Sequence, residues 1–454
     1  MKKLSLEKLI FYTVFISTLF VLIYNYFHYS PKLGYDASAH FTYVDYFSKY
    51  LPDSIKLPSS SDSREFFNPP VAYIFPSIIQ VICRNVIVSN NFLSDCQSVY
   101  GNFTMIFQGL IYLFTIFINL KSIQKLLNLD SSQVTIYFLL VSMLAVNYRT
   151  ISMIRGEPYI LFFLSLLIFF LIDVLTLNFK VERKTYFIVG LIIACIALSR
   201  QWGFLLFPAL GVLFFHKSIN KSLDYFKFLS YTFFIGFIFS SWFYFGLFFE
   251  YGTFTAFNKD SLGFDFLNKP LTFYLPNTKH FVYLFTNPIR PYLNNQFITT
   301  LYADVWGDYW GYFSFTSQYL DIGRNQLEIG SYFAKVNILS LITTTVALTC
   351  FFLANRKFKN HFVIKYISFS VLFSLLGYLW FTISFPEPSG DTVKATYIIQ
   401  MFHLIIFSSS LYLESIKNEK PKLYNSVLVI LFSIYVFNFQ TYLSHFPLDF
   451  ISNL

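Results

Sequence analysis

The hydrophobic positions of this 454-residue chain fall into long, nearly unbroken runs separated by short polar segments. A helix needs about 17 to 25 apolar residues to cross a lipid bilayer. Two of the runs, on either side of Arg200, are shorter than that. The pattern predicts spans at 9–29, 99–120, 131–148, 157–178, 185–199, 203–216, 227–249, 332–354, 361–384, 393–414 and 423–444.

Residues 70–88 are also apolar, but they contain Pro76 and Arg84. Without this segment, the loops on the side of the amino terminus carry about 16 Lys or Arg in roughly 48 residues, against about 13 in roughly 181 on the other side. Cytoplasmic loops are enriched in basic residues, and counting 70–88 as a span would invert every later loop. We therefore expect an in-plane or re-entrant helix on the outer face.

This topology predicts an all-α integral membrane protein, a polytopic bundle of about 11 transmembrane helices in one domain over residues 1–454. Two large outer-face loops, about 30–98 and 250–331, are expected to contain in-plane helices and to form a chamber over the bundle. The first run lacks a small-residue cleavage site, so we expect a retained helix and not a removed signal peptide. No internal repeat and no pair of broken helices in matching halves is evident.

Composition agrees with a membrane protein, because 55% of the residues are hydrophobic and only 13% are charged. Soluble domains carry about a quarter charged residues. The net charge of +9 is interpreted as basic inner loops, so no nucleic-acid partner is expected. The four cysteines show no metal-type spacing, although Cys83 and Cys96 could pair if both face an oxidising compartment.

The first outer loop places Asp36 about seven residues after a predicted membrane helix, with His40 one helical turn further on. Ionisable residues at such a position suggest a functional site. Asp36 is the candidate general base, and His40 could orient it or share its proton. The alternatives are a helix cap for Asp36 and a structural or interfacial role for His40, and Asp45 is a weaker candidate.

Three cations at the outer ends of predicted spans are candidates for binding a phosphate group: Arg155, Arg200 and Lys394. The planar guanidinium of Arg presents several fixed donors and stays charged when it is partly desolvated. Snorkelling or contact with lipid headgroups is the alternative, above all for Arg149. For Lys394 the alternative is an ion pair with Glu387 or Asp391.

The second outer loop contains the sequence LYADVWGDYWGYF, with Asp304, Trp306, Asp308 and Trp310 inside ten residues. Aromatic rings beside carboxylates suit sugars, whose C–H faces stack on rings while their hydroxyls form hydrogen bonds. An interfacial aromatic belt is the alternative interpretation. A divalent cation on the two aspartates is an open option, although the spacing is not that of a calcium loop.

These motifs, in their order and sidedness, resemble the GT-C membrane glycosyltransferases, and most closely the branch of dolichyl-phosphate-mannose protein mannosyltransferases and aminoarabinose transferases. The similarity covers roughly the first 210 residues, including RGEP at Arg155 and LSRQWG around Arg200. The chain departs from the family at Ala37, where many members have a second acid, and at Asn68, where some have Lys. The residues that carry the resemblance are Asp36 and His40 in YDASAH, and Glu65, Pro69, Pro70 and Tyr73 in EFFNPPVAY.

The resemblance implies inverting transfer of a sugar from a polyprenyl-phosphate donor to a lipid, glycan or protein acceptor. Asp36 would deprotonate the acceptor, and the three cations would stabilise the leaving phosphate. Glu65 and Tyr73 would join the tryptophan-rich loop in binding substrate. No metal site and no cofactor are assigned, and the missing second acid at Ala37 favours a metal-free mechanism.

The expected location is the bacterial plasma membrane with the site on its outer face, or alternatively the endoplasmic reticulum membrane with a lumenal site. Two other classes remain. A flippase or transporter of lipid-linked glycans would place charges near mid-span and show pseudo-repeats. An O-antigen polymerase or ligase would centre its site on the later loop, where His280 is the only histidine.

Overall fold

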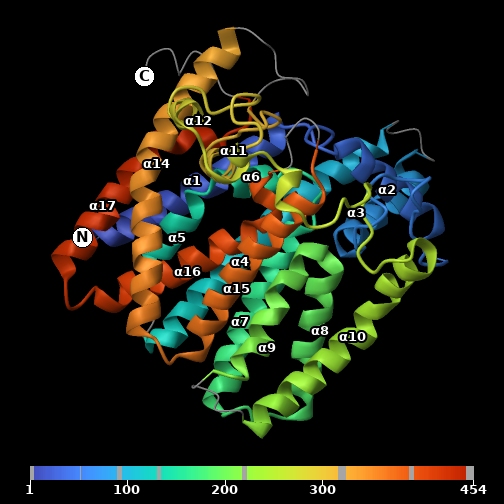
Figure 1. Ribbon diagram of the computed structural model, residues 1–454, viewed down its shortest axis with the longest axis horizontal. Helices are drawn as coiled ribbons and strands as arrows, with labels where there is room; N and C mark the ends of the chain where they lie inside the picture. The colour runs from blue at the N-terminus through green and yellow to red at the C-terminus, as the bar shows by residue number, and fades with distance from the viewer. Residues whose placement is uncertain are drawn as a thin grey trace.

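The computed structural model describes residues 5–51, 53–88, 95–129, 134–216, 222–314, 324–387 and 393–445. Within these ranges the chain is helical and contains no strand. Eight helices are long and apolar enough to cross a membrane, which makes the chain an α-helical, multi-pass membrane protein. They form one bundle (Figure 1) and are α1 (Leu6–His28), α4 (Cys96–Leu127), α7 (Glu157–Thr176), α10 (Leu223–Tyr251), α14 (Arg324–Lys357), α15 (Phe362–Ser384), α16 (Ile399–Ile416) with the preceding 3-10 helix η4 (Ala395–Ile398), and α17 (Pro421–Phe437) with the following 3-10 helix η5 (Asn438–Tyr442).

The other three predicted spans are short or broken, so the count of about 11 remains a prediction. The segment 131–148 becomes α5 (Thr135–Ser142) and α6 (Ala145–Ile151). The run 185–199 is α8 (Arg183–Ser199), with 17 residues. The run 203–216 divides into the 3-10 helix η2 (Gln201–Leu206) and α9 (Phe207–Leu213).

Polar side chains stabilise the break between α5 and α6. The carbonyl of Val141 accepts hydrogen bonds from Asn147 Nδ2 at 2.9 Å and from the Tyr112 hydroxyl at 3.4 Å. The carbonyl of Ser142 accepts one from the Tyr148 hydroxyl at 3.1 Å. Interior backbone groups that leave a helical ladder need such partners.

Both long loops of the predicted topology contain short helices, while their place on the outer face remains a prediction. The first loop holds α2 (Ala37–Tyr50) and α3 (Val71–Ile82), which continues as the π-helix η1 (Cys83–Val88). The 12-residue α3 contains Pro76 and is too short for a span. Its Tyr73 ring stacks on Tyr43 of α2 at 3.7 Å. The second loop holds η3 (Phe266–Asn268), α11 (Leu271–Tyr274), α12 (Thr278–Leu284) and α13 (Ile298–Trp306).

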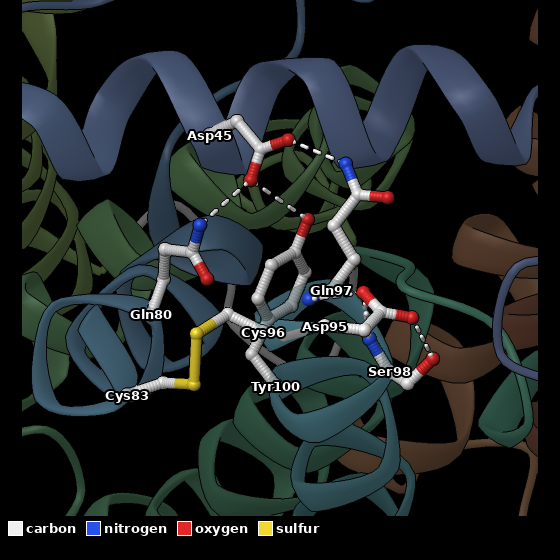
Figure 2. Close-up of a disulfide and its surroundings, with 8 residues drawn as sticks. All are labelled: Asp45, Gln80, Cys83, Asp95, Cys96, Gln97, Ser98 and Tyr100. Atoms are coloured by element: carbon white, nitrogen blue, oxygen red, sulfur yellow. Dashed lines mark hydrogen bonds between the residues drawn. A yellow bond between two sulfur atoms is a disulfide. The ribbon is translucent and has the colours of Figure 1, made fainter. Parts of the chain in front are cut away.

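A disulfide between Cys83 and Cys96 joins η1 to the start of α4, which confirms the pairing that the sequence allowed. Beside it, the Asp45 carboxylate of α2 accepts hydrogen bonds from Gln80, Gln97 and Tyr100 (Figure 2). The disulfide and this carboxylate together fix α2, α3 and α4 to one another at one end of the bundle.

The disulfide predicts a thiol pattern in the native protein. We expect alkylation without reductant to modify Cys195 and Cys350 in denatured protein and to leave Cys83 and Cys96 unmodified until reductant is added. The double variant Cys83→Ser/Cys96→Ser should lose about 3 kcal/mol of stability, the value for a loop of this length. Peptide mass spectrometry checks the pattern, and free thiols at Cys83 and Cys96 would contradict it.

Candidate functional site

A cavity of about 130 Å³ opens where the two outer loops meet the ends of α8 and α15. Its lining includes the charged side chains of Asp36, Glu65, Arg200 and Lys394. These four residues are far apart in the sequence and were each predicted as site residues. The lining also includes six aromatic side chains, Phe67, Trp202, Phe257, Phe381, Phe385 and Tyr397.

Asp36 stands at the N-cap of α2 in the left-handed region, with φ of 61°. This conformation is unfavourable for most residues other than Gly, Asn and Asp. Its carboxylate caps no backbone amide, contrary to the helix-cap alternative. Instead Oδ2 pairs with Lys394 Nζ at 3.0 Å. This ion pair holds the pKa of Asp36 well below its usual range, although burial opposes the shift, so the carboxylate is ionised.

Lys394 lies just before α16 and is surrounded by aromatic rings. Its Nζ is 4.4 Å from the centroid of Tyr35, 5.3 Å from that of Trp310 and 5.4 Å from that of Tyr397. Burial opposes the charge, but Asp36 and the neighbouring tyrosines raise the pKa of Lys394, which keeps it cationic.

The ordinary alternatives for Lys394 can now be assessed. Glu387 pairs with Lys259 at the edge of the cavity and not with Lys394. Asp391 lies outside the described residues.

Arg200 connects α8 to η2 and reaches the cavity wall between two carboxylates. Its Nε lies 3.3 Å from Glu157 Oε1, and its Nη1 lies 3.9 Å from Glu65 Oε2. A side chain at Gly156 would place its Cβ 2.1 Å from the carbonyl oxygen of Ser199. Only glycine therefore allows the segment that carries Glu157 to approach Arg200 so closely.

Arg155 lies behind the cavity wall and is buried. Its guanidinium lies 4.4 Å from the Tyr35 ring centroid, and Nη2 donates a hydrogen bond to the Tyr35 carbonyl. Among the described residues, its Nε and Nη1 have no hydrogen-bond partner. Arg155 thus fixes the backbone immediately before Asp36 while it keeps unused donors.

His40 contacts Tyr73 and Glu65 rather than Asp36. Its Nδ1 forms a 2.6 Å hydrogen bond with the Tyr73 hydroxyl, and its Nε2 lies 3.9 Å from Glu65 Oε2. Burial lowers the pKa of His40 well below its usual value, and the nearby Arg155 and Arg200 add to the shift, so the ring is neutral.

Glu65 and Asp36 both line the cavity, but the pKa shifts of their carboxyl groups are opposite in direction. Burial raises the pKa of Glu65, while Arg200 opposes the shift. Its carboxylate accepts a hydrogen bond from Asn68 Nδ2. Asn68 therefore contacts a carboxylate at the position where some relatives in the resembled family carry Lys.

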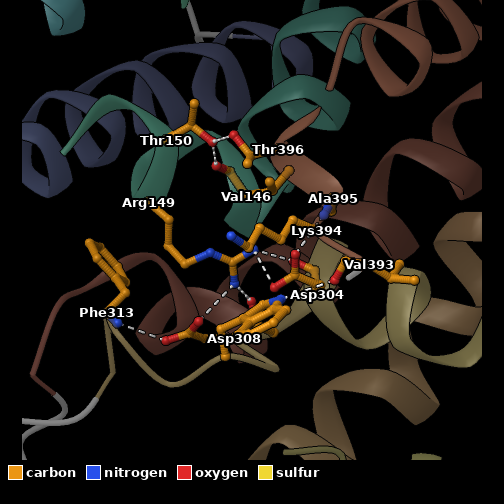
Figure 3. A network of polar contacts seen from close by, with 12 residues as sticks. Val146, Arg149, Thr150, Asp304, Asp308, Phe313, Val393, Lys394, Ala395 and Thr396 are labelled. Carbon is orange, nitrogen blue, oxygen red and sulfur yellow. Dashed lines mark hydrogen bonds and ion pairs between the residues drawn. The ribbon is translucent and has the colours of Figure 1, made fainter. Parts of the chain in front are cut away.

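The aspartates of the tryptophan-rich loop form a buried network with Arg149 (Figure 3). Arg149 Nη2 lies 3.1 Å from Asp304 Oδ1, and Nη1 lies 3.4 Å from Asp308 Oδ1. Asp304 Oδ2 accepts a hydrogen bond from the amide of Ala395 at 2.7 Å. Burial raises the pKa of Asp304 to about 6, although Arg149 opposes the shift. Arg149 is therefore neither snorkelling nor exposed to lipid headgroups.

The two tryptophans of this loop point to different places. Trp310 Nε1 donates to the carbonyl of Val393 at 3.0 Å, and its ring faces Lys394. Trp306 lines a second, apolar cavity of about 380 Å³ that lies between α13, α14, α15 and α16. Of the predicted loop residues, none lines the cavity of Asp36, and only Trp310 contacts one of its residues.

No protein-family model, curated protein or solved structure matches this chain. The function is therefore inferred from the residues and their geometry. Across the described ranges there is no cluster of three or more His, Cys, Asp and Glu that could hold a metal ion. A divalent cation stays an untested option.

Several residues of the site escaped the sequence analysis. Glu157 lies in the RGEP sequence itself, next to a residue that was singled out. Tyr35 directly precedes Asp36, and Trp202 follows Arg200 by two positions. Tyr397 had no such signal, because only the fold brings the start of α16 to the first outer loop.

The buried network predicts a large stability difference between two cation substitutions. Arg149→Met leaves Asp304 and Asp308 without their buried counterion and should destabilise the protein by about 3–5 kcal/mol. Lys32→Met removes an exposed pair with Asp95 and should cost at most about 1 kcal/mol. Thermal unfolding in detergent measures both. Equal effects would contradict the structural role of Arg149.

Proposed function

We propose that the chain is a membrane glycosyltransferase that moves a sugar from a polyprenyl-phosphate donor to the hydroxyl or amine of an acceptor. One observation carries this proposal. The ionised Asp36 and the cations Lys394 and Arg200 line one cavity together with six aromatic side chains. A base, a phosphate-binding group and a surface for sugar stacking are therefore adjacent.

Lys394 and Arg200 suit the phosphate of the donor. Arg200 lies too far from Glu65 for a hydrogen bond, at 3.9 Å, so it retains donors for a ligand. Arg keeps its charge in a partly dry site and presents a planar fork to phosphate oxygens. Trp202 and Tyr397 line the same cavity, where sugar C–H faces can stack on their rings.

The resting ion pair suggests how the base is activated. While Asp36 is paired with Lys394, its depressed pKa makes it a poor proton acceptor. An incoming phosphate competes for Lys394, and a carboxylate that loses its cationic partner regains a higher pKa. Donor binding would thus convert Asp36 into a more effective base.

The transfer step needs no reactant other than the donor and the acceptor. The acceptor O–H or N–H proton passes to Asp36, and the acceptor atom forms a bond to the anomeric carbon. The bond from that carbon to the phosphate oxygen breaks on the opposite face, and its electron pair leaves with the polyprenyl phosphate. Lys394 and Arg200 stabilise the charge that develops on the phosphate.

Three features around the cavity support a lipid-linked donor on an outer or lumenal face. The apolar cavity of about 380 Å³ includes Met401 and Phe402, about two helical turns along the chain from Lys394, and offers room for a hydrocarbon chain. Its roof, α13, is hydrogen-bonded to the segment that carries Lys394. The disulfide suits an oxidising compartment such as the outer face of a plasma membrane or a lumen.

A transporter of lipid-linked sugars is the second candidate, because α5 and α6 form a discontinuous helix in the core of the bundle. Transporters use such breaks to build binding sites. Sugar transfer and lipid transport are separable, so the variants below distinguish the two functions.

Asp36→Asn should abolish transfer while the protein still folds, because Asn tolerates the left-handed conformation. We expect a loss of at least about 100-fold, the usual contribution of a general base. Transfer of radiolabelled sugar from polyprenyl phosphate in proteoliposomes measures it, with Asp62→Asn in the same outer loop as the control. Unchanged transfer in Asp36→Asn would refute the proposed base.

Lys394→Met and Arg200→Gln should each weaken binding of a polyprenyl phosphate by about tenfold or more, since each removes a charge-assisted contact. Native mass spectrometry with added polyprenyl phosphate measures the bound fraction. Lys259→Gln is the matched control, because Lys259 lines the same cavity but pairs with Glu387. A loss of similar size in the control would argue against a defined phosphate site.

A further inference from the structure

Residues 262–282 of the second outer loop expose a series of large apolar side chains. Leu267 is 89% exposed, Leu271 73%, Leu262 70% and Leu275 66%. Single exposed hydrophobic residues are normal, but a continuous patch marks an interaction surface. We call this surface the loop patch, and its members are Leu262, Phe266, Leu267, Leu271, Leu275 and Phe281.

Hydrogen bonds to α15 fix the position of the first half of the loop patch along the bilayer normal. The amide of Leu262 donates to the carbonyl of Ser384 at 3.0 Å, and Asn268 Nδ2 donates to that of Ile383 at 3.2 Å. The 23 residues of α15 extend about 34 Å at about 1.5 Å per residue. The hydrocarbon core is about 30 Å thick, so this contact lies at its outer boundary.

Contacts with α14 independently indicate the depth of the second half of the loop patch in the bilayer. Asn337 Nδ2 donates to the carbonyl of Leu284 at 3.0 Å, at the end of α12. Asn337 lies about 20 residues before Lys357, the basic end of the same helix, and this length also corresponds to about 30 Å. The second half of the loop patch therefore lies at the same outer boundary, beside α14 (Figure 1).

The spanning helix that holds the first half of the loop patch also exposes apolar side chains. On α15, the spanning helix to which it is hydrogen-bonded, Leu372, Leu376 and Trp380 are 45%, 50% and 48% exposed. In a membrane these side chains contact acyl chains. The polar members of the segment, such as Asp265 and Lys279, are exposed as well, which suits a position among headgroups.

We propose that residues 262–282 lie in the outer leaflet of the membrane, with the loop patch inserted at the boundary between headgroups and acyl chains. Such insertion buries apolar area without spanning the bilayer. The same loop supplies Phe257 and Lys259 to the cavity of Asp36. The mouth of that cavity therefore lies at the lipid surface, where an amphiphilic molecule can enter sideways from the leaflet. This inference does not depend on the proposed chemistry.

Single-cysteine variants of the full chain in phospholipid nanodiscs test the insertion. In a background with Cys195→Ala and Cys350→Ala and the disulfide intact, an environment-sensitive fluorophore is attached at Leu267→Cys, Phe281→Cys or the exposed helix position Lys49→Cys. The two patch positions should be quenched at least about twofold more by brominated acyl chains than the Lys49 position, because only they insert. Aqueous iodide should show the reverse order.

Wild-type protein provides a second measurement that does not depend on variants. A phospholipid with a photoactivated carbene in its acyl chain should label peptides that contain Leu267 and Leu271. Labels confined to the spanning helices, together with iodide quenching of the patch positions, would overturn the proposal. That result would identify the loop patch as a docking surface for another protein.

Discussion

The buried ion pairs of Arg149 are the interactions on which the arrangement of the second long loop depends. Arg149 lies on α6, inside the bundle, and binds two aspartates of the second outer loop. One of these aspartates also binds the amide that follows Lys394. A charge removed from water is stable only when its partners surround it. This one cation therefore fixes the loop and the segment before α16 to the bundle, and with them the position of Lys394.

In the cavity of Asp36, oppositely charged side chains form ion pairs that a ligand could replace. The carboxylate and the lysine neutralise each other at 3.0 Å. Two acidic side chains, Glu65 and Glu157, lie beside Arg200 at 3.9 Å and 3.3 Å. Each cation is held by a partner that a stronger anion could displace. The charged groups of the cavity are therefore held in place by contacts that binding of a ligand could break.

The helical membrane class followed from hydropathy, because long apolar runs have few other solutions. The break in the predicted helix at 131–148 did not follow from hydropathy, because a run that is apolar in sequence can face protein instead of lipid. Asp36, Arg200 and Lys394 were identified individually, since a charge at the edge of an apolar run is costly and therefore conspicuous. Their mutual contacts were not predictable, because Asp36 and Lys394 meet across 358 residues of sequence. The roles of Asp304 and Asp308 depended on Arg149, for which the pattern alone left snorkelling or contact with lipid headgroups as an alternative.

One feature of the fold bears on how the protein is made. From Val134 to Leu161 every residue is buried, across α5, α6 and the start of α7. The eight residues of α5 span only about 12 Å, less than half the hydrocarbon thickness. Such a segment gains little by entering a bilayer alone, because α16 and α1 provide most of its surroundings. Since α16 is synthesised more than 250 residues later, α5 can reach its final environment only after the carboxy-terminal helices have been inserted. The bundle therefore assembles around α5 late, after its carboxy-terminal helices have been inserted, and not by sequential addition of finished helices.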